Sequence, residues 1–117
     1  MKKLLTAALL TSSLCAGFSS TVMAADTIRF AMEATYPPFE STNEKNEIVG
    51  FDVDLAKALC AEIKAECTFS NQAFDSLIPS LKFRRYDAAI SAMDITEERL
   101  KQVDFTKPYY DNAAVFI

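Results

Sequence analysis

The sequence contains no histidine and only two glycines among its 117 residues. Without histidine the chain lacks the commonest general base, the Ser-His-Asp and Cys-His catalytic arrangements, and the ligands of most zinc sites. Gly17 and Gly50 are too few to form any of the glycine-rich loops that hold phosphate groups. Much of enzyme catalysis is therefore excluded, and we expect no catalytic residue, no metal and no cofactor.

The first two dozen residues have the pattern of a secretory signal peptide. A basic start, Met1-Lys2-Lys3, precedes an apolar run over residues 4–18, and Val22-Met23-Ala24 supplies small or apolar residues before a cleavage point. We therefore expect a signal peptide over residues 1–24. Outside it, no apolar run reaches the ~18–20 residues that a membrane span requires.

Charge limits the partners of the remaining chain. The whole sequence has 12 basic and 16 acidic residues, and removal of residues 1–24 takes away two lysines and leaves a net charge of −6. This acidic balance argues against nucleic acid and anionic membranes and suits a cationic small ligand. The remaining 93 residues are enough for one small domain and short for a two-lobed protein.

Two of the three cysteines, Cys60 and Cys67, remain after removal of the signal peptide, in a chain exported to an oxidising compartment. A structural disulfide is favoured over a metal site, because no histidine or further cysteine can complete one, and over a redox pair, because the spacing is not Cys-x-x-Cys. Cys15 is expected to leave with the signal peptide. Its use as a lipoprotein attachment site is the minor alternative, because Leu14 is larger than such sites prefer.

Hydrophobic periodicity predicts strands over residues 27–31, 67–70 and 87–91, with helices between and after them. The first helix, over 52–64, places on one face Leu55, Ala56, Leu59, Cys60 and Ile63. The second contains Pro79 in its first turn, and the third covers 97–102; the polar stretch 40–47 is expected to be a loop, and another strand to begin at 113–117. This order predicts an α/β fold with a parallel sheet.

Ligands of such sheets bind beyond the carboxyl ends of the strands, where the strand order reverses. The segments that leave those ends carry carboxylates, aromatic rings, hydroxyls and an arginine, namely Glu33, Tyr36, Gln72, Phe74, Asp75, Ser91, Ala92, Met93, Asp94, Ile95, Thr96 and Arg99. These groups suit an amphoteric small molecule: an arginine holds a carboxylate, a carboxylate holds a cation, and aromatic rings stack on a planar cation.

Each residue also has a purely structural interpretation. The Tyr-Pro-Pro-Phe segment at 36–39 fits a rigid turn with an aromatic plug, and Phe74 fits a core position. Asp94 and Thr96 fit helix caps, and Arg99 fits a solvated helix surface. The binding interpretation therefore depends on all of them lying at one edge of the sheet.

Four segments, in order, resemble the polar amino acid-binding proteins, the periplasmic receptors of ABC importers known as solute-binding protein family 3. They are Thr-Tyr-Pro-Pro-Phe-Glu-Ser (35–41), Ile-Val-Gly-Phe-Asp-Val-Asp-Leu-Ala (48–56), Phe-Asp-Ser-Leu-Ile-Pro-Ser-Leu (74–81) and Met-Asp-Ile-Thr-Glu-Glu-Arg (93–99). The resemblance is greatest to the arginine-binding members. It implies the periplasmic binding protein type II fold, a periplasmic location, a monomer, and an ABC permease in the inner membrane as partner.

The resemblance also implies ligand-binding roles. Arg99 would hold the ligand α-carboxylate, helped by the backbone near Ala92 and by Asp94 or its neighbours. Tyr36 and Phe74 would enclose the side chain, Glu33 would meet the distal cation, and Ser91 would add a polar contact. The expected ligand is a basic L-amino acid, with arginine favoured, and the expected site comprises Glu33, Tyr36, Phe74, Ser91, Ala92, Met93, Asp94 and Arg99. Ala92 stands where relatives often have glycine.

Members of the family continue for well over a hundred further residues, through a second lobe and back. We therefore expect residues 25–113 to form the N-terminal part of lobe 1 only, residues 114–117 to begin the crossover to a second lobe, and the chain to be a truncated form with weak arginine binding or none. Two alternatives stay open. One is an enzyme on the same scaffold, such as a periplasmic dehydratase; the other is a sensor or interaction lobe without a transport role.

Overall fold

The computed structural model describes residues 23–113 and 115–117. The signal peptide expected over residues 1–24 lies outside the described residues except for its last two, and Cys15 lies outside them as well. The elements of the described chain are β1 (Thr27–Met32), β2 (Thr35–Tyr36), β3 (Glu40–Thr42), β4 (Ile48–Val49), α1 (Phe51–Glu62), β5 (Glu66–Asn71), a 3₁₀ turn (Phe74–Ser76), α2 (Leu77–Lys82), β6 (Ala88–Ala89) and α3 (Glu97–Leu100).

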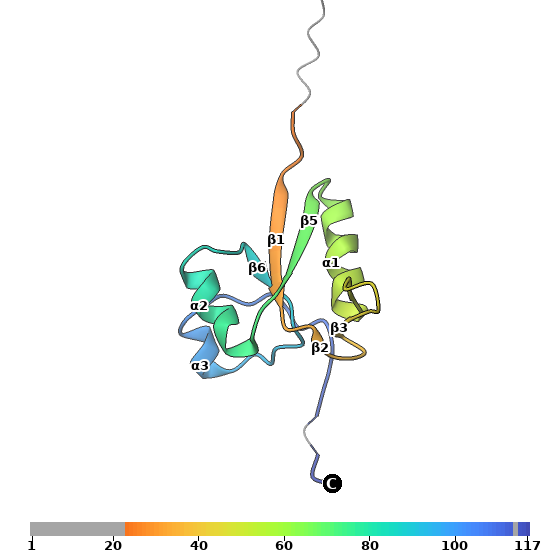
Figure 1. Ribbon diagram of the computed structural model, residues 1–117. Coiled ribbons are helices and arrows are strands. Elements are labelled where there is room, and N and C mark those ends of the chain that lie inside the picture. Colours follow the sequence, from red (N-terminus) through yellow and green to blue (C-terminus); the bar gives the residue numbers. More distant parts are fainter. Residues whose placement is uncertain (1–22, 114) are drawn as a thin grey trace, which may run out of the picture.

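Three parallel strands form the main sheet in the order β5-β1-β6. β1 pairs with β5 over its whole length, from Thr27 opposite Glu66 to Met32 opposite Asn71, and with β6 at Phe30 and Ala31. The chain thus crosses from one side of β1 to the other, and α1 and α2 lie on opposite sides of the strands (Figure 1). The predicted parallel α/β layer is confirmed, with β6 shorter than the expected strand over 87–91.

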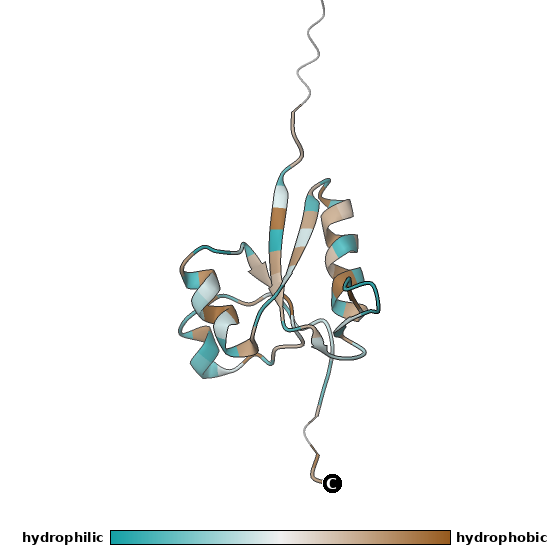
Figure 2. Cartoon of the chain, viewed as in Figure 1, coloured by the Kyte–Doolittle hydropathy of each residue, from teal (hydrophilic) through white to brown (hydrophobic). Residues whose placement is uncertain are grey.

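The core lies between one face of β1 and the inner face of α1. Side chains alternate along β1, so that Phe30 and Met32 join Val53, Ala56 and Cys60 in one buried cluster. Bands of different hydropathy follow one another along the first part of β1 (Figure 2).

The predicted helix over 52–64 is confirmed by α1, but its predicted buried face is wrong in part. Leu59 is 53% exposed and Ile63, just beyond the helix, is 62% exposed, whereas Val53 is buried. Val53, Ala56 and Cys60 recur at three- and four-residue spacing and form the stripe that packs on the sheet, so Leu59 lies on the outward side.

A disulfide joins Cys60, near the end of α1, to Cys67 in β5. This confirms the predicted structural bridge. Cys67 pairs with Ile28 near the start of β1, so the cross-link fixes the end of the sheet where the strands begin.

A small antiparallel sheet, β2-β3-β4, precedes α1. The expectation of a loop over 40–47 is therefore wrong for residues 40–42, which pair on both sides with β2 and β4. The turn between β3 and β4 is closed by Asn43. Its side-chain oxygen accepts from the backbone N–H groups of Lys45 and Glu47 at 2.9 Å each. Gly50, which joins this sheet to α1, has φ 133°, and a side chain there would run into the carbonyl of Phe39.

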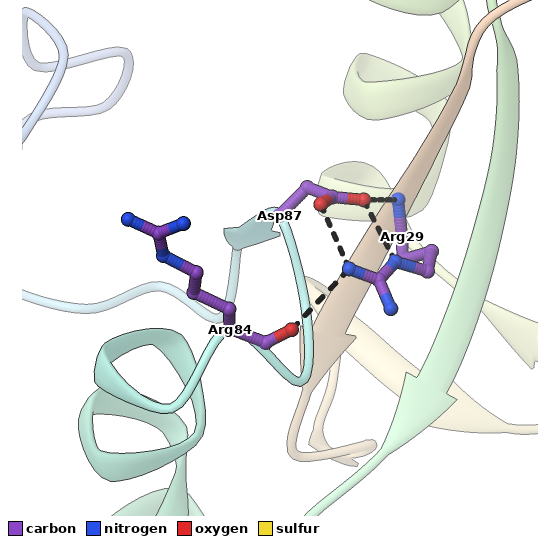
Figure 3. A network of polar contacts seen from close by, with 3 residues as sticks. All are labelled: Arg29, Arg84 and Asp87. Atoms are coloured by element: carbon purple, nitrogen blue, oxygen red, sulfur yellow. Dashed lines mark hydrogen bonds and ion pairs between the residues drawn. The ribbon is translucent and has the colours of Figure 1, made fainter.

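The edge strand β6 is held to β1 by an ion pair near its start. The guanidinium of Arg29 donates to both carboxylate oxygens of Asp87, from Nε at 2.9 Å and from Nη2 at 3.0 Å, and Nη2 also reaches the carbonyl of Arg84 (Figure 3). This bidentate pair is exposed, and it lowers the pKa of Asp87 to about 2, through the side-chain hydrogen bond first and the backbone N–H of Arg29 second.

Of the last two predicted elements, the helix over 97–102 is confirmed and the strand over 113–117 is wrong. α3 begins after Thr96, whose hydroxyl accepts from the backbone N–H of Arg99 at 3.2 Å, and it ends two residues before the predicted 102. The expected strand over 113–117 is not formed by Ala113 or by residues 115–117. A strand needs a neighbour to pair with, and among the described residues the sheet has its edge at β6.

Candidate functional site

The segments that follow the three parallel strands meet at one edge of the sheet, as predicted. The backbone N–H of Glu33, after β1, donates to the hydroxyl of Ser91, after β6, at 2.9 Å. On the other side, the N–H of Gln72 donates to the carbonyl of Met32 at 2.8 Å, and that of Ala34 donates to the side chain of Asn71 at 2.9 Å. These bonds bring the strand ends together, and we call this edge the rim.

A groove of about 570 Å³ opens at the rim. Four of the predicted site residues line it: Tyr36, Ala92, Met93 and Asp94. Residues 105–112, which have no regular secondary structure, line much of the rest. This segment has no helical or strand periodicity, so the sequence pattern did not indicate a role for it at the site. Its one signal is the aromatic pair that follows Pro108.

Phe74 and Arg99 lie against each other beside this groove. The guanidinium carbon of Arg99 is 5.4 Å from the centre of the Phe74 ring, and its Nη1 donates to the backbone carbonyl of Asp94 at 2.8 Å. The Asp94 carboxylate accepts from the side-chain amide of Asn112 at 2.9 Å. Arg99 is thus fixed in place by an aromatic face and a carbonyl, neither of which neutralises its charge.

Ser91 lies under the rim and is 4% exposed. Its hydroxyl accepts from the N–H of Glu33 and donates to Oε1 of Glu40 at 2.8 Å, so it links the end of β1 to β3. Glu33 itself is partly exposed, directly beyond the end of β1. The other four predicted residues do not line the groove: Glu33, Phe74, Ser91 and Arg99. They are linked to one another or to the lining by the Glu33–Ser91 hydrogen bond, the Arg99–Asp94 hydrogen bond and the contact between Arg99 and Phe74.

Aromatic rings pack around Phe39 at one side of the groove. Tyr36 stacks on it at 5.7 Å between ring centres, and Tyr110 meets it edge-on at 4.9 Å. Phe51, at the start of α1, meets it edge-on at 6.1 Å. The predicted plug in the turn at 36–39 is thus present, and Tyr36 is at once 58% exposed and a wall of the groove. The packing orients Tyr36 so that its outer surface is available to a ligand.

Two acids that are not among the predicted site residues are buried beneath the rim. Glu40 is 1% exposed and Asp52 is fully buried. Oδ2 of Asp52 accepts from the backbone N–H of Ala92 at 2.8 Å, and Ala92 has a left-handed φ of 45°. Burial raises the pKa of Glu40 to about 8, helped by Asp52 and opposed by the hydrogen bond from Ser91.

Two absences hold within the described residues. No group of three or more Asp, Glu or Cys side chains there is placed to hold a metal ion. Across 23–113 and 115–117, no helix is long and apolar enough to cross a membrane.

Comparison with protein families places residues 28–117 within the bacterial extracellular solute-binding proteins, family 3. The ABC transporter arginine-binding protein 1 of Escherichia coli K12 is 66% identical over 117 residues, all of this chain and 46% of that protein. The chain thus spans about half the length of the curated relatives it matches.

Solved structures agree. A Salmonella typhimurium periplasmic binding protein described for its high arginine specificity, STM4351, matches with a TM-score of 0.72 and 55% identity over 74% of this chain and 38% of that one. Domain 1 of TmArgBP from T. maritima, solved in its arginine-bound form, matches with a TM-score of 0.71 and 46% identity over 73% of this chain and 68% of that one. The neighbours have the type II periplasmic binding protein fold.

Proposed function

Because this chain belongs to family 3 of the bacterial extracellular solute-binding proteins, we propose that it binds a basic L-amino acid, arginine in the first place, at the rim of its parallel sheet. The observation that carries the proposal is the juxtaposition at the rim. Arg99, which forms no ion pair among the described residues, contacts the ring of Phe74 and the backbone carbonyl of Asp94. Tyr36 and Asp94 line the groove at the same edge of the sheet, and Glu33 follows β1 there. This combination matches a ligand that carries a carboxylate at one end and a planar cation at the other.

Each group has a chemical task in the proposed complex. Arg99 presents its remaining N–H donors to the ligand α-carboxylate, and the backbone around Ala92 adds a contact. Tyr36 and Phe74 cover the ligand side chain, and Glu33 receives the guanidinium, with Asp94 adding negative charge. Met93 supplies an apolar wall, and Ser91 acts from below by fixing Glu33 in position.

The arginine-bound domain 1 of TmArgBP supports binding by one lobe, since this chain matches 68% of that chain's length. Residues 25–113 then correspond to the N-terminal part of lobe 1, and residues 114–117 to the start of the crossover. We expect weaker binding than in a two-lobed receptor, because one rim covers only one side of a ligand, whereas small-molecule sites usually bury 70–90% of the ligand surface.

The same family membership supports a periplasmic location and delivery of the ligand to an ABC permease, with the chain acting as a monomer. A transport role is favoured over an enzyme on this scaffold and over a sensor lobe, because the relatives are transporter components.

Titration calorimetry with a set of related ligands tests the proposal. L-Citrulline replaces the guanidinium of arginine by a neutral urea of the same shape, and agmatine lacks the α-carboxylate. A charge-assisted hydrogen bond contributes about 1.5–3 kcal/mol, so each loss is expected to weaken binding by roughly tenfold or more. Equal affinity for arginine and citrulline would refute recognition of the cation.

Two variants locate the site. Glu33→Gln is expected to weaken arginine binding and to leave citrulline binding nearly unchanged. The matched control is Glu62→Gln, at the end of α1 farthest from the rim, and it is expected to bind arginine as the parent chain does. If both variants bind arginine equally well, Glu33 does not meet the cation.

A further inference from the structure

Beneath the rim, the buried acids Glu40 and Asp52 hold the backbone of both segments that present the site. Glu40 accepts from the Ser91 hydroxyl at 2.8 Å, and that hydroxyl accepts from the N–H of Glu33. Asp52 accepts from the N–H of Ala92 at 2.8 Å. Each acid uses one carboxylate oxygen for this purpose, so the positions of Glu33 and Ala92 depend directly on the two acids.

The second oxygen of each acid is buried, and no hydrogen bond from the part of the chain that the structure describes reaches it. These two atoms are Oε2 of Glu40 and Oδ1 of Asp52. The two residues are neighbours in space, because the backbone N–H of Asp52 donates to the carbonyl of Phe39, the residue before Glu40, at 2.9 Å. Two ionised carboxylates buried side by side would repel each other, and each would retain an oxygen that no described group satisfies.

We propose that Glu40 and Asp52 share one proton, donated by the Glu40 carboxyl to Asp52, and that this pair is a positioning device that keeps the rim in its binding form. A protonated carboxyl is a donor as well as an acceptor, so a single proton satisfies both buried oxygens and removes one of the two charges. Asp52 then remains the anion that holds the Ala92 N–H. The proposal deepens the proposed arginine-binding function, and its consequence for affinity rests on that function.

The surroundings of the pair favour the shared proton. The carboxylate of Glu33, at the end of β1, adds negative charge that raises the pKa of Glu40 further. Tyr109, from the segment beside the groove, faces Asp52; burial and the negative charge of Asp52 raise the pKa of that phenol, so it stays neutral. The hydrogen bond from Ser91, by contrast, favours the ionised form of Glu40. Among the described residues, no cation pairs with either acid.

The direction of the pH effect follows. The pKa of Glu40 in the folded chain, about 8, is above the ordinary value of 4.5, so the folded form binds a proton that the unfolded form releases. The stabilisation is complete below the ordinary pKa and is lost as the pH rises toward and through 8. Above that pH, two anions face each other beneath the rim, and the backbone at Glu33 and Ala92 is expected to shift.

Carbon-13 NMR of the side-chain carboxyl groups, with amide spectra of the same ligand-free sample, tests the pair. We expect the Glu40 carboxyl to titrate near pH 8. The amides of Glu33 and Ala92 are expected to shift with the same midpoint. If the Glu40 carboxyl titrates at an ordinary value, or if the two amides do not follow it, the proposal is overturned. No arginine is present, so failure of the proposed function leaves this result unaffected.

Two substitutions of Glu40 distinguish the effect of the shared proton from the effect of the packed side chain. In Glu40→Gln the amide oxygen still accepts from Ser91 and the amide N–H₂ donates to Asp52 without a proton to lose. The rim amides are therefore expected to keep their low-pH positions up to about pH 10, well above the pKa of the parent pair. Glu40→Ala removes both bonds and is expected to displace the rim amides at every pH. If Glu40→Gln displaces them as Glu40→Ala does, a shared proton is not what positions the rim.

With arginine as the probe, the parent chain is expected to lose affinity severalfold between pH 6 and 9.5, and Glu40→Gln is expected to lose much less. Arginine keeps its guanidinium charge and its carboxylate charge over this range, whereas its α-amino group loses its proton in both experiments alike. Equal losses in the two proteins would show that the ligand, and not the buried pair, is the source of the pH dependence.

Discussion

Reduction of the Cys60–Cys67 disulfide is expected to lower the free energy of unfolding by about 2.5 kcal/mol. The bridge spans seven residues of sequence separation, and the chain-entropy relation for a loop of this size gives a value of that order. Reduction changes no other atom, and Cys60 stays in the core, where it is 3% exposed. The loss therefore reports the cross-link itself.

The assay is urea unfolding of the chain with and without a thiol reductant. For a domain of this size, a loss of 2.5 kcal/mol corresponds to a fall of roughly 10–20 °C in Tm. A chain in which Cys60 and Cys67 are both alanine is the control, and reductant is expected to have no effect on it. A loss below about 1 kcal/mol in the parent chain would refute the reasoning, since the loop-entropy estimate would then fail by more than half.

Reduction of the disulfide also tests whether the stability of the fold and the affinity for arginine depend on different ends of the sheet. Cys67 pairs with Ile28 near the start of β1, whereas the rim begins at the end of the same strand, after Met32. We therefore expect the folded fraction of the reduced chain to bind arginine as the oxidised chain does. A large loss of affinity in the folded fraction would show that the two ends of the sheet are coupled.

Three further predictions concern the backbone and the surface. Gly50→Ala is expected to lower stability by at least about 1–2 kcal/mol in urea unfolding, because φ is 133° there and the added carbon meets the carbonyl of Phe39; a neutral effect would contradict this geometry. Ala92→Gly is expected to raise stability by about 0.5–1 kcal/mol, because glycine tolerates the left-handed φ of 45°; a loss would show that the methyl group is needed. Because Arg29 lowers the pKa of Asp87 to about 2, the pair contributes stability above about pH 4 that disappears as the pH falls toward 2, and Asp87→Asn is expected to remove that acid dependence from an unfolding series.

The parallel sheet was predictable because its strands and helices differ in periodicity, and short connections leave few topologies. The inward face of α1 was predictable only in part. Ala56 and Cys60 were correctly expected in the core, whereas Leu59 and Ile63 are exposed although they are strongly apolar. Which edge of an apolar stripe meets the sheet depends on tertiary packing, which hydropathy does not contain.

At the site, residues that follow strand ends were predictable because parallel strands all end at one edge. The roles of Glu40 and Asp52 were not, since an acid in a polar stretch or at a helix start is usually solvated. Their burial depends on the β2-β3-β4 sheet, whose strands of two or three residues are too short for a periodic signal. Residues 105–112 also have no periodic pattern, so the sequence did not predict their position. They are held at the groove by tertiary contacts such as that between Phe39 and Tyr110.

The measurement that tests the central claim most directly is a two-dimensional amide NMR titration of the oxidised chain with millimolar L-arginine. We predict a dispersed spectrum in which the amides of Glu33, Tyr36, Ala92, Asp94 and Arg99 shift with one common binding curve, while those of α1 beyond Cys60 stay in place. A dispersed spectrum in which no rim amide moves, or in which the shifts lie away from the rim, would contradict arginine binding at this site.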